Sequence, residues 1–268
     1  MLSSDSRPNV ATLKRAARSL GVHSHLKSIY WGLSVPRVLH ALSRKRTVTH
    51  RIRGVAVDVP VGEYWQYQRF RWMHPELKLF EELVESLEPG DVFYDVGAHL
   101  GWHSVVAASV DSGVEVVAFE PHPAVADRLE TTLRATSHEV DCRRTALLDE
   151  NGTVAFTGAP DPAAHVSGVY GSEETNTIQV DAAAGDTLVA DGEIQPPDIV
   201  KIDAEGAEAA VLRGLQTTIR EHRPRSIYCE VHTDAPAIRE ILDDLGYVYQ
   251  PLASARPILR AVPESDPS

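Results

Sequence analysis

Acidic and histidine side chains follow several apolar runs of this sequence at positions where they could do chemistry. The stretch "VKIDAEG" contains Asp203 and Glu205 directly after its apolar part, and "YCEVH" contains Glu230 and His232. Carboxylates and imidazoles placed in this way can ligate a divalent cation, accept a proton as a general base or orient a substrate hydroxyl. Structural roles are the alternative, because Asp203 could cap a helix and Glu205 could complement its dipole.

The stretch "DVGAHLGWHS", residues 95–104, joins an apolar run to a helical pattern and holds Asp95, Gly97 and Gly101. Glycine lets a ligand approach the backbone, and the start of a helix offers free N–H groups. The spacing is Gly-x-x-x-Gly and not the full dinucleotide fingerprint. This stretch by itself therefore fits either a nucleotide-type loop or a plain tight turn.

A second acid strengthens the ligand interpretation. Glu120 ends the apolar run of "VVAFE", nineteen residues after Gly101. At this distance an open α/β sheet places the acid that binds ribose hydroxyls, whereas the alternative is a capping role before Pro121. Acids at the ends of two neighbouring strands favour a nucleoside-type ligand.

The elements that must position these residues alternate in type from residue 91 onward. Strand patterns at 91–97, 114–120, 140–147, 198–203 and 225–232 are interleaved with helical patterns at 101–109, 124–135, 207–219 and 235–246. This alternation predicts right-handed βαβ units and a mostly parallel sheet with helices on both faces. The last two β patterns, "YVYQPL" and "PILRAV", predict a hairpin that adds one antiparallel strand.

Three further segments complete the predicted organisation. Residues 1–53 form a basic, amphipathic helical extension, residues 54–262 form the main domain, and residues 263–268 form a disordered tail. Within the main domain, a short strand is expected in "GVAVDVPVG", residues 54–62, and a helix in 75–89. Residues 150–185 interrupt the alternation with a β-rich, hairpin-like insertion. Two cysteines are too few for a disulfide framework or a zinc pattern.

Charge is distributed unevenly along the chain. Residues 1–53 carry eleven Lys and Arg against one acid, while the whole chain has a net charge of −12. The basic segment could bind an anionic membrane surface or pack on the acidic domain, and nucleic acid is disfavoured because no reader motif accompanies it. An acidic domain in a chain with only five lysines predicts a salt-adapted protein. The lack of a signal-peptide pattern or a run of ~20 apolar residues predicts a cytoplasmic protein, with peripheral attachment to the inner face of the membrane as an option.

Four motifs in order, "DVGAHLGWHS", "AFEPHP", "PPDIVKIDAEGAEAAVLRGL" and "RPRSIYCEVH", resemble the FkbM-type family of S-adenosylmethionine-dependent methyltransferases over about residues 75–250. The resemblance implies a Rossmann-like class I methyltransferase fold and S-adenosylmethionine as cofactor. It also implies that Asp95, Gly97 and Gly101 hold the methionine part, that Glu120 holds the ribose, that Thr145 and Ala146 lie near adenine, and that Asp203 and Glu205 lie near the transferred methyl. His99 stands where the family usually has asparagine; its imidazole can donate a hydrogen bond to the cofactor but can also titrate near neutral pH.

The resemblance further implies O-methylation of a small-molecule or sugar acceptor. The basic extension suggests that the acceptor is a lipid-linked glycan or uronic acid at the membrane surface. The insertion, with His165 and Tyr170, would cover the acceptor. Asp203 or Glu205 would be the base for a hydroxyl acceptor, helped by Glu230 and His232, whereas a carboxylate acceptor needs no base. The competing classes are a nicotinamide-dependent oxidoreductase, a non-catalytic nucleoside-binding domain and a metal-dependent hydrolase.

Overall fold

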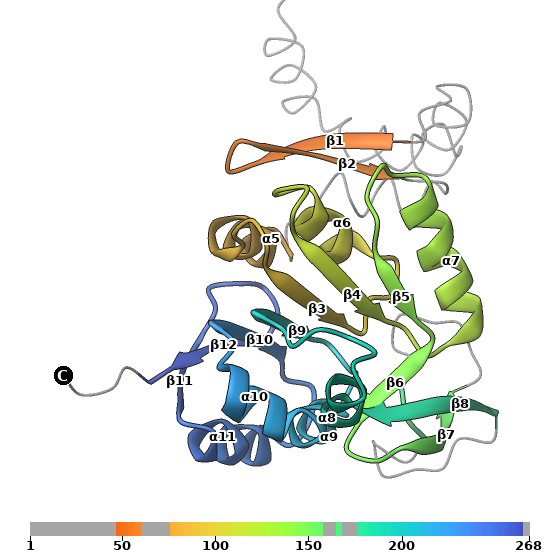
Figure 1. Ribbon diagram of the computed structural model, residues 1–268, viewed down its shortest axis with the longest axis vertical. Helices are drawn as coiled ribbons and strands as arrows, with labels where there is room; N and C mark the ends of the chain where they lie inside the picture. The colour runs from red at the N-terminus through yellow and green to blue at the C-terminus, as the bar shows by residue number, and fades with distance from the viewer. Residues whose placement is uncertain (1–46, 61–75, 158–164, 168–175, 265–268) are drawn as a thin grey trace, which may run out of the picture.

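The computed structural model describes residues 47–60, 76–157, 165–167 and 176–264, and its centre is a seven-stranded sheet in the order β11-β12-β10-β9-β3-β4-β5 (Figure 1). The pairings among β10, β9, β3, β4 and β5 are parallel, and β12 runs antiparallel to both of its neighbours. This confirms the predicted parallel sheet and terminal hairpin. The strands are β3 (Val92–Val96), β4 (Glu115–Phe119), β5 (Asp141–Arg143), β9 (Ile199–Ile202), β10 (Ser226–Glu230), β11 (Tyr247–Pro251) and β12 (Ile258–Pro263).

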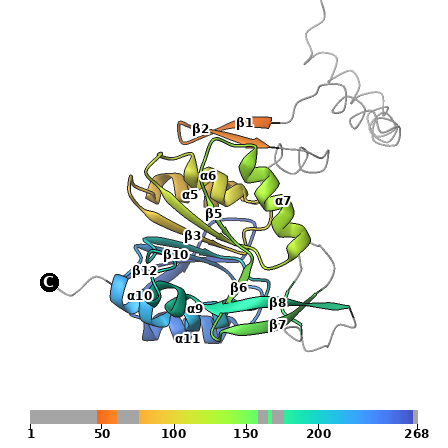
Figure 2. The same ribbon diagram turned by 45° about the vertical axis from the view of Figure 1, so that its right-hand side comes forward.

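Helices cover both faces of this sheet (Figures 1 and 2). On one face lie α5 (Leu77–Ser86), α6 (Trp102–Ala108) and α7 (Pro123–Arg134); on the other lie α8 (Gly185–Ala190), α9 (Glu208–Gly214), α10 (Gln216–His222) and α11 (Ala235–Asp244). Successive strand residues face opposite layers: Phe93 packs with α5 and α6, and Tyr94 packs with the cluster formed by α9, α10 and α11. The central strands are therefore buried on both sides, which explains their continuous apolar runs.

The helix predicted over 207–219 is divided into α9 and α10, which meet at Leu215. Its predicted apolar face is nevertheless correct, because Ala207, Val211, Leu215 and Ile219 are all buried. The single stripe of apolar residues survives the break because both short helices pack on the same side of the sheet.

A β-hairpin, β1 (Thr47–Ile52) and β2 (Val55–Pro60), packs outside α6 and α7. The prediction of a helical extension up to residue 53 is therefore wrong for its last residues. Alternation decides the structure here: Thr47, Thr49 and Arg51 are exposed, whereas Ile52 is buried against the helices. The rest of the extension, residues 1–46, lies outside the described residues, as do Tyr170 and tail residues 265–268.

The predicted insertion contains a hairpin, with β7 (Gly152–Thr157) antiparallel to β8 (Thr177–Ala184). A further strand, β6 (Thr145–Leu148), pairs in parallel with β8, so this sheet has the order β6-β8-β7. The prediction of a single strand at 140–147 is thus wrong. The chain leaves one sheet and enters the other at Arg144, because β5 pairs with β4 in the large sheet and β6 pairs with β8 in the small one.

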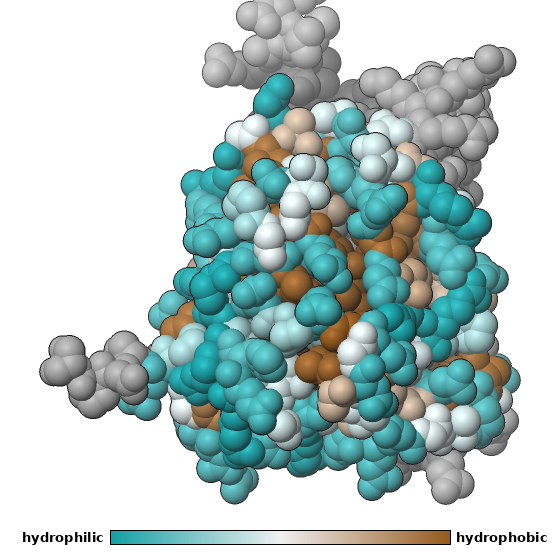
Figure 3. All heavy atoms as spheres, viewed as in Figure 1, coloured by the Kyte–Doolittle hydropathy of each residue, from teal (hydrophilic) through white to brown (hydrophobic). Residues whose placement is uncertain are grey.

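The described surface is mainly hydrophilic on the face shown in Figure 3, with apolar residues gathered near its middle. This matches a sequence in which charged residues make up 24% of the chain. Among the described helices, none has the length and apolar character needed to cross a membrane.

Candidate active site

A cleft of about 1040 Å³, part of it open to solvent, lies where β3, β4 and β9 end. In an open α/β sheet this carboxyl edge is the usual place for a ligand. Seven of the eleven predicted site residues line the cleft: Gly97, His99, Glu120, Thr145, Ala146, Asp203 and Glu205. The other four, Asp95, Gly101, Glu230 and His232, are close to the cleft without lining it.

The two predicted glycines are required for packing and backbone conformation. Both have positive φ angles, 72° at Gly97 and 78° at Gly101. A Cβ on Gly97 would lie 1.9 Å from the carbonyl oxygen of Asp203, and one on Gly101 would lie 2.5 Å from Leu129 in α7. Glycine therefore lets the chain approach the β9 turn at Gly97 and α7 at Gly101. Gly97 also lines the cleft, and the predicted role of admitting a ligand stays a prediction.

Asp95 differs from its predicted role, because its carboxylate is fully buried and does not line the cleft. One of its oxygens lies 3.0 Å from Nζ of Lys201, and the other accepts a hydrogen bond from Ser104. Lys201 in turn donates to the carbonyl oxygens of Val96 and Gly97. Although burial alone would raise it, the pKa of Asp95 is lowered by Lys201, so a buried ion pair holds the glycine turn in place.

Glu120 lines the cleft, and the residue is only 7% exposed. Its two oxygens accept hydrogen bonds from the backbone N–H groups of His99 and His122, each at 3.0 Å. Burial raises the pKa of Glu120 to about 7. The remaining lone pairs of this carboxylate can accept hydroxyl hydrogens from a ligand.

His99 has a φ angle of 50°, in the left-handed region that histidine, aspartate and asparagine enter more readily than most residues. This explains how histidine can replace the asparagine usual at this position. Its backbone contact with Glu120 is independent of the side chain. The predicted contact of its imidazole with a cofactor stays a prediction.

Thr145 and Ala146, on β6, line the cleft together with Phe156 and Val166 of the insertion. Phe156 and Val166 form a bridge and pack in one cluster with Ala146. The described part of the insertion therefore lies at the Ala146 side of the cleft. His165 makes backbone hydrogen bonds with Thr157, and it is not among the lining residues.

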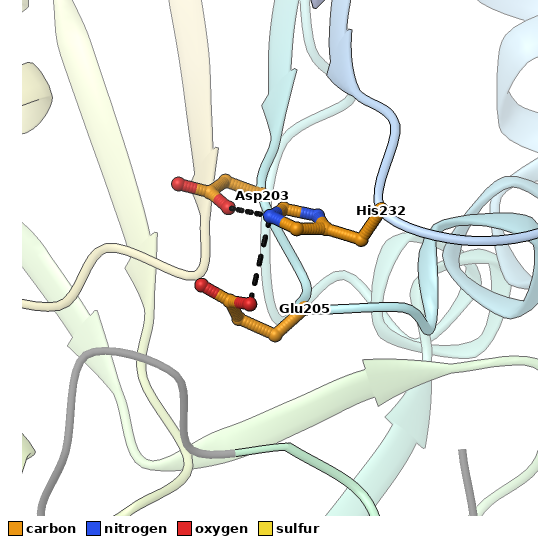
Figure 4. A group of neighbouring side chains, drawn as sticks. All are labelled: Asp203, Glu205 and His232. Carbon is orange, nitrogen blue, oxygen red and sulfur yellow. Dashed lines mark ion pairs between the residues drawn. The ribbon is translucent and has the colours of Figure 1, made fainter. Parts of the chain in front are cut away.

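Asp203 and Glu205 come together with His232 beside the cleft, and their side chains point toward one another (Figure 4). Nε2 of His232 lies 3.8 Å from Asp203 Oδ1 and 3.5 Å from Glu205 Oε2. The capping alternative is wrong for Asp203, because α9 begins after Ala207 without a side-chain cap. Glu205 has a φ angle of 45°, which fits a residue held by its surroundings at a functional position.

The other nitrogen of His232, Nδ1, lies 2.8 Å from Oε1 of Glu208. The Glu208 side chain is fully buried, and the same oxygen accepts a hydrogen bond from the Gly206 N–H. The hydrogen bond with Glu208 is the main cause that raises the pKa of His232 to about 9. The imidazole is therefore protonated at neutral pH in this state, with Nε2 directed to the two carboxylates.

Glu230 is held by Arg256, whose Nη1 donates to both carboxylate oxygens at 2.8 and 3.0 Å. Burial raises the pKa of Glu230, and Asp203 raises it further. Arg256 lines the cleft, whereas Glu230 lines a smaller neighbouring cavity. Glu230 therefore contacts Arg256, which lines the cleft, but does not line the cleft itself.

The comparison with known families decides what this arrangement is. Residues 95–249, more than half of the chain, match the profile described as "Methyltransferase FkbM domain". The chain belongs to the FkbM methyltransferase family. The motifs on which the resemblance was based, from Asp95 through His232, all lie within the matched residues.

Two similar proteins support the assignment of the chain to the FkbM methyltransferase family. The chain is 29% identical over 169 residues to hexuronic acid methyltransferase AglP of Haloferax volcanii, covering 63% of this chain and 68% of the relative. It is 28% identical over 205 residues to 31-O-demethyl-FK506 methyltransferase FkbM of Streptomyces tacrolimicus, covering 65% of this chain and 78% of the relative.

A solved structure supports the fold. A crystal structure of methyltransferase FkbM from Methylobacillus flagellatus superposes with a TM-score of 0.51 at 14% identity, covering 74% of this chain. The chain spans about half of that protein, 54% of its length. Together with the strand order, this shows the Rossmann-like methyltransferase fold expected from the sequence.

Four site residues were missed by sequence reasoning: Lys201, Glu208, Arg256 and His103. The sequence did mark Lys201 as unusual, because it is one of only five lysines and the single charged residue inside an apolar strand. His103 lies in the quoted glycine stretch and lines the cleft, only 9% exposed. Arg256 is brought to the site from the loop before β12, which no local pattern reveals.

Proposed function

We propose that this protein is an S-adenosylmethionine-dependent O-methyltransferase that acts on a sugar or other small-molecule acceptor. One observation carries the proposal. A single cleft has a buried carboxylate suited to ribose, Glu120, on one strand end and a charged cluster, Asp203 and Glu205, on another. A nucleoside cofactor and a polar acceptor can therefore lie in the same cleft.

The residues present fit the cofactor. Glu120 has free lone pairs for the ribose hydroxyls, and Thr145 and Ala146 form a wall at the small sheet for adenine. Near Gly97, the His103 side chain lines the cleft, and its Nε2 has no hydrogen-bond partner within the described residues. Burial lowers the pKa of His103, so its neutral imidazole can bind a polar group of the methionine part. When bound, S-adenosylmethionine supplies an electrophilic methyl group.

The chain's own residues must orient the acceptor and, for a hydroxyl, take its proton. Asp203 and Glu205 are suited to this because both line the cleft. Burial raises the pKa of Glu205, which makes its carboxylate a better proton acceptor than an exposed glutamate. His232 is already protonated by its interaction with Glu208, so it orients these carboxylates and does not act as the base. Asp95 and Lys201 hold the β3 turn.

A sugar acid is the acceptor class that the relatives favour, since the name of AglP specifies a hexuronic acid. Arg256 supports this proposal, because a guanidinium that lines the cleft can bind a carboxylate. Arg256 would then bind the acceptor carboxylate as well as its present partner, Glu230.

The test is isothermal titration with S-adenosylhomocysteine and, separately, with NAD, followed by transfer of labelled methyl to glucuronic acid. Micromolar binding of S-adenosylhomocysteine alone supports the proposal, whereas binding of NAD alone would favour an oxidoreductase. Binding without transfer to any sugar or hydroxylated small molecule would favour the non-catalytic nucleoside-binding domain. Hydrolysis that a chelator abolishes would favour the metal-dependent hydrolase.

The membrane-surface interpretation rests on the nine basic residues of 1–46, which lie outside the described residues. We propose that this segment brings the enzyme to anionic lipid. The test is flotation of the full chain with phosphatidylglycerol vesicles, compared with a variant in which all nine are glutamine. Equal recovery would contradict the proposal. The hairpin β1–β2 is left intact because it packs on the domain.

The predicted adaptation to salt is also retained as a proposal. Beyond residue 53 the chain has fifteen basic and thirty-seven acidic residues, and excess negative charge destabilises a compact state unless it is screened. The unfolding temperature should therefore rise steadily between about 0.2 and ~3 M KCl. At the higher concentration the Debye length is below ~3 Å, so the surface charges are screened from one another. No rise would contradict the proposal.

A further inference from the structure

The side chains of Asp203, Glu205 and His232 come from two different strand ends and meet in a geometry that suits a metal ion. Each offers one ligand atom, and these three atoms all lie within 4.8 Å of one another. Carboxylates suit Mn²⁺ and Mg²⁺, whereas an imidazole suits transition-metal ions, so Mn²⁺ fits the whole set better than Mg²⁺ does. Figure 4 shows both carboxylates directed at the same nitrogen, Nε2.

The histidine is held as a metal-binding histidine usually is. Nδ1 is bound by a buried carboxylate, Glu208, and Nε2 is left to face the other two groups. This carboxylate–histidine arrangement orients a metal ligand and fixes the tautomer that presents Nε2. With an ion bound, Nε2 would lose its proton and Nδ1–H would still donate to Glu208.

An unsatisfied oxygen atom of a proposed ligand is a further observation. Within the described residues, Asp203 Oδ1 is excluded from solvent and accepts no hydrogen bond. Buried polar atoms without partners are uncommon in native structures and require an explanation, such as an ion.

Negative charge is also in excess at this place. Within the described residues, four carboxylates lie at the cluster, namely Asp203, Glu205, Glu208 and Glu230, and the cationic side chains of His232 and Arg256 contact them. Lys201 is 3.9 Å from Asp203 but pairs more closely with Asp95. An anionic acceptor would meet repulsion here unless a cation were added.

We propose that Asp203, Glu205 and His232 bind one divalent transition-metal ion, best fitted by Mn²⁺, which holds the oxygen atoms of the acceptor at the cleft. The inference rests on the proposed function for the role of the ion, although the ion site itself can be tested without an acceptor. The ion would complete its coordination with the acceptor's carboxylate or hydroxyl oxygens and would lower the pKa of a bound hydroxyl. Asp203 and Glu205 would then act as ligands in place of the base role, and the proton of a hydroxyl acceptor would leave to water in the open part of the cleft.

The experiment is titration of the chelator-treated full chain with Mn²⁺, followed by loss of the free-ion electron paramagnetic resonance signal. One ion per chain should bind, and the Asp203→Asn and His232→Asn variants should bind it at least tenfold more weakly. The matched control is Asp244→Asn, an exposed carboxylate at the end of α11, which should bind as the unchanged protein does. Pulsed electron paramagnetic resonance of the unchanged protein should show coupling to a directly bound imidazole nitrogen.

Binding of S-adenosylhomocysteine is measured on the same samples and separates the two proposals. Normal S-adenosylhomocysteine binding without saturable Mn²⁺ binding would overturn the metal site and leave the methyltransferase proposal standing. Equal Mn²⁺ binding in the Asp203→Asn and His232→Asn variants would also overturn it. If those variants fail to fold, the nitrogen coupling decides, and its absence from the bound Mn²⁺ would contradict the site.

Discussion

Glu208 and His232 form a hydrogen bond of 2.8 Å between a fully buried carboxylate and an imidazole beside the cleft. Glu208 lines neither described cavity, so it acts through the position of His232. We expect Glu208→Gln to lower the turnover of methyl transfer by about 10–100-fold, as for other residues that orient an active-site histidine. Affinity for S-adenosylhomocysteine should stay within about twofold, because cofactor residues are untouched. A parallel loss of cofactor binding would indicate a general structural role.

Lys201 should be essential for stability because its ammonium is 3% exposed and pairs with Asp95, which is 0% exposed. Lys201→Met leaves a buried carboxylate without its cation, and we expect the free energy of unfolding to fall by about 3–5 kcal/mol. Adding Asp95→Asn should restore part of this loss, since the uncompensated charge is then removed. Urea unfolding of the two variants and of the unchanged protein is the measurement; equal stability of both variants would contradict the coupling.

Gly97 and Gly192 have nearly the same φ, 72° and 71°, but different surroundings. A Cβ on Gly192 meets nothing within 4 Å, whereas one on Gly97 would lie 1.9 Å from the backbone of Asp203. Gly192→Ala should therefore cost about 1–2 kcal/mol of stability from backbone strain alone. Gly97→Ala should cost about 2–5 kcal/mol and should also weaken S-adenosylhomocysteine binding. Denaturant unfolding and calorimetry of both variants would show whether the difference exists.

Glu120 should make cofactor affinity depend on pH. Its pKa is raised by burial to about 7, and the ionised form is the better acceptor for two ribose hydroxyls. Affinity for S-adenosylhomocysteine should therefore increase between pH 6 and 8, and Glu120→Gln should weaken binding at pH 8 and flatten the profile. Titration calorimetry at several pH values would measure this; an unchanged slope in the variant would assign it elsewhere.

The same group has the opposite effect on stability. Because the folded-state pKa lies above the ordinary value of 4.5, the folded state holds the proton more tightly than the unfolded chain. Its contribution to the free energy of unfolding is complete below pH 4.5 and is lost as the pH rises through 7. Urea unfolding at pH 5 and pH 8 should show this part of the decrease disappearing in Glu120→Gln.

The seven-stranded sheet and the edge that carries the site could be predicted because buried parallel strands and amphipathic helices leave strong periodic patterns. The acids after β4 and β9 were found since a residue that follows a strand lies at a known edge. Of the β1–β2 hairpin, β2 was predicted as a short strand, whereas β1 was missed because its short alternation lies within a basic segment that was interpreted as helical. The division of 140–147 between two sheets depends on partners distant in sequence, which no local pattern contains.

By itself, the sequence determined the family, the order of the central elements and the residues that follow each strand. Only the tertiary structure decided what those residues do. In the fold, Asp95 is buried in an ion pair with Lys201, and Gly97 lies so close to the Asp203 backbone that a Cβ has no room. Glu208 contacts His232, which is twenty-four positions away in the sequence. Periodicity is local and can be read along a chain, whereas charge pairing and close packing depend on which distant segments meet.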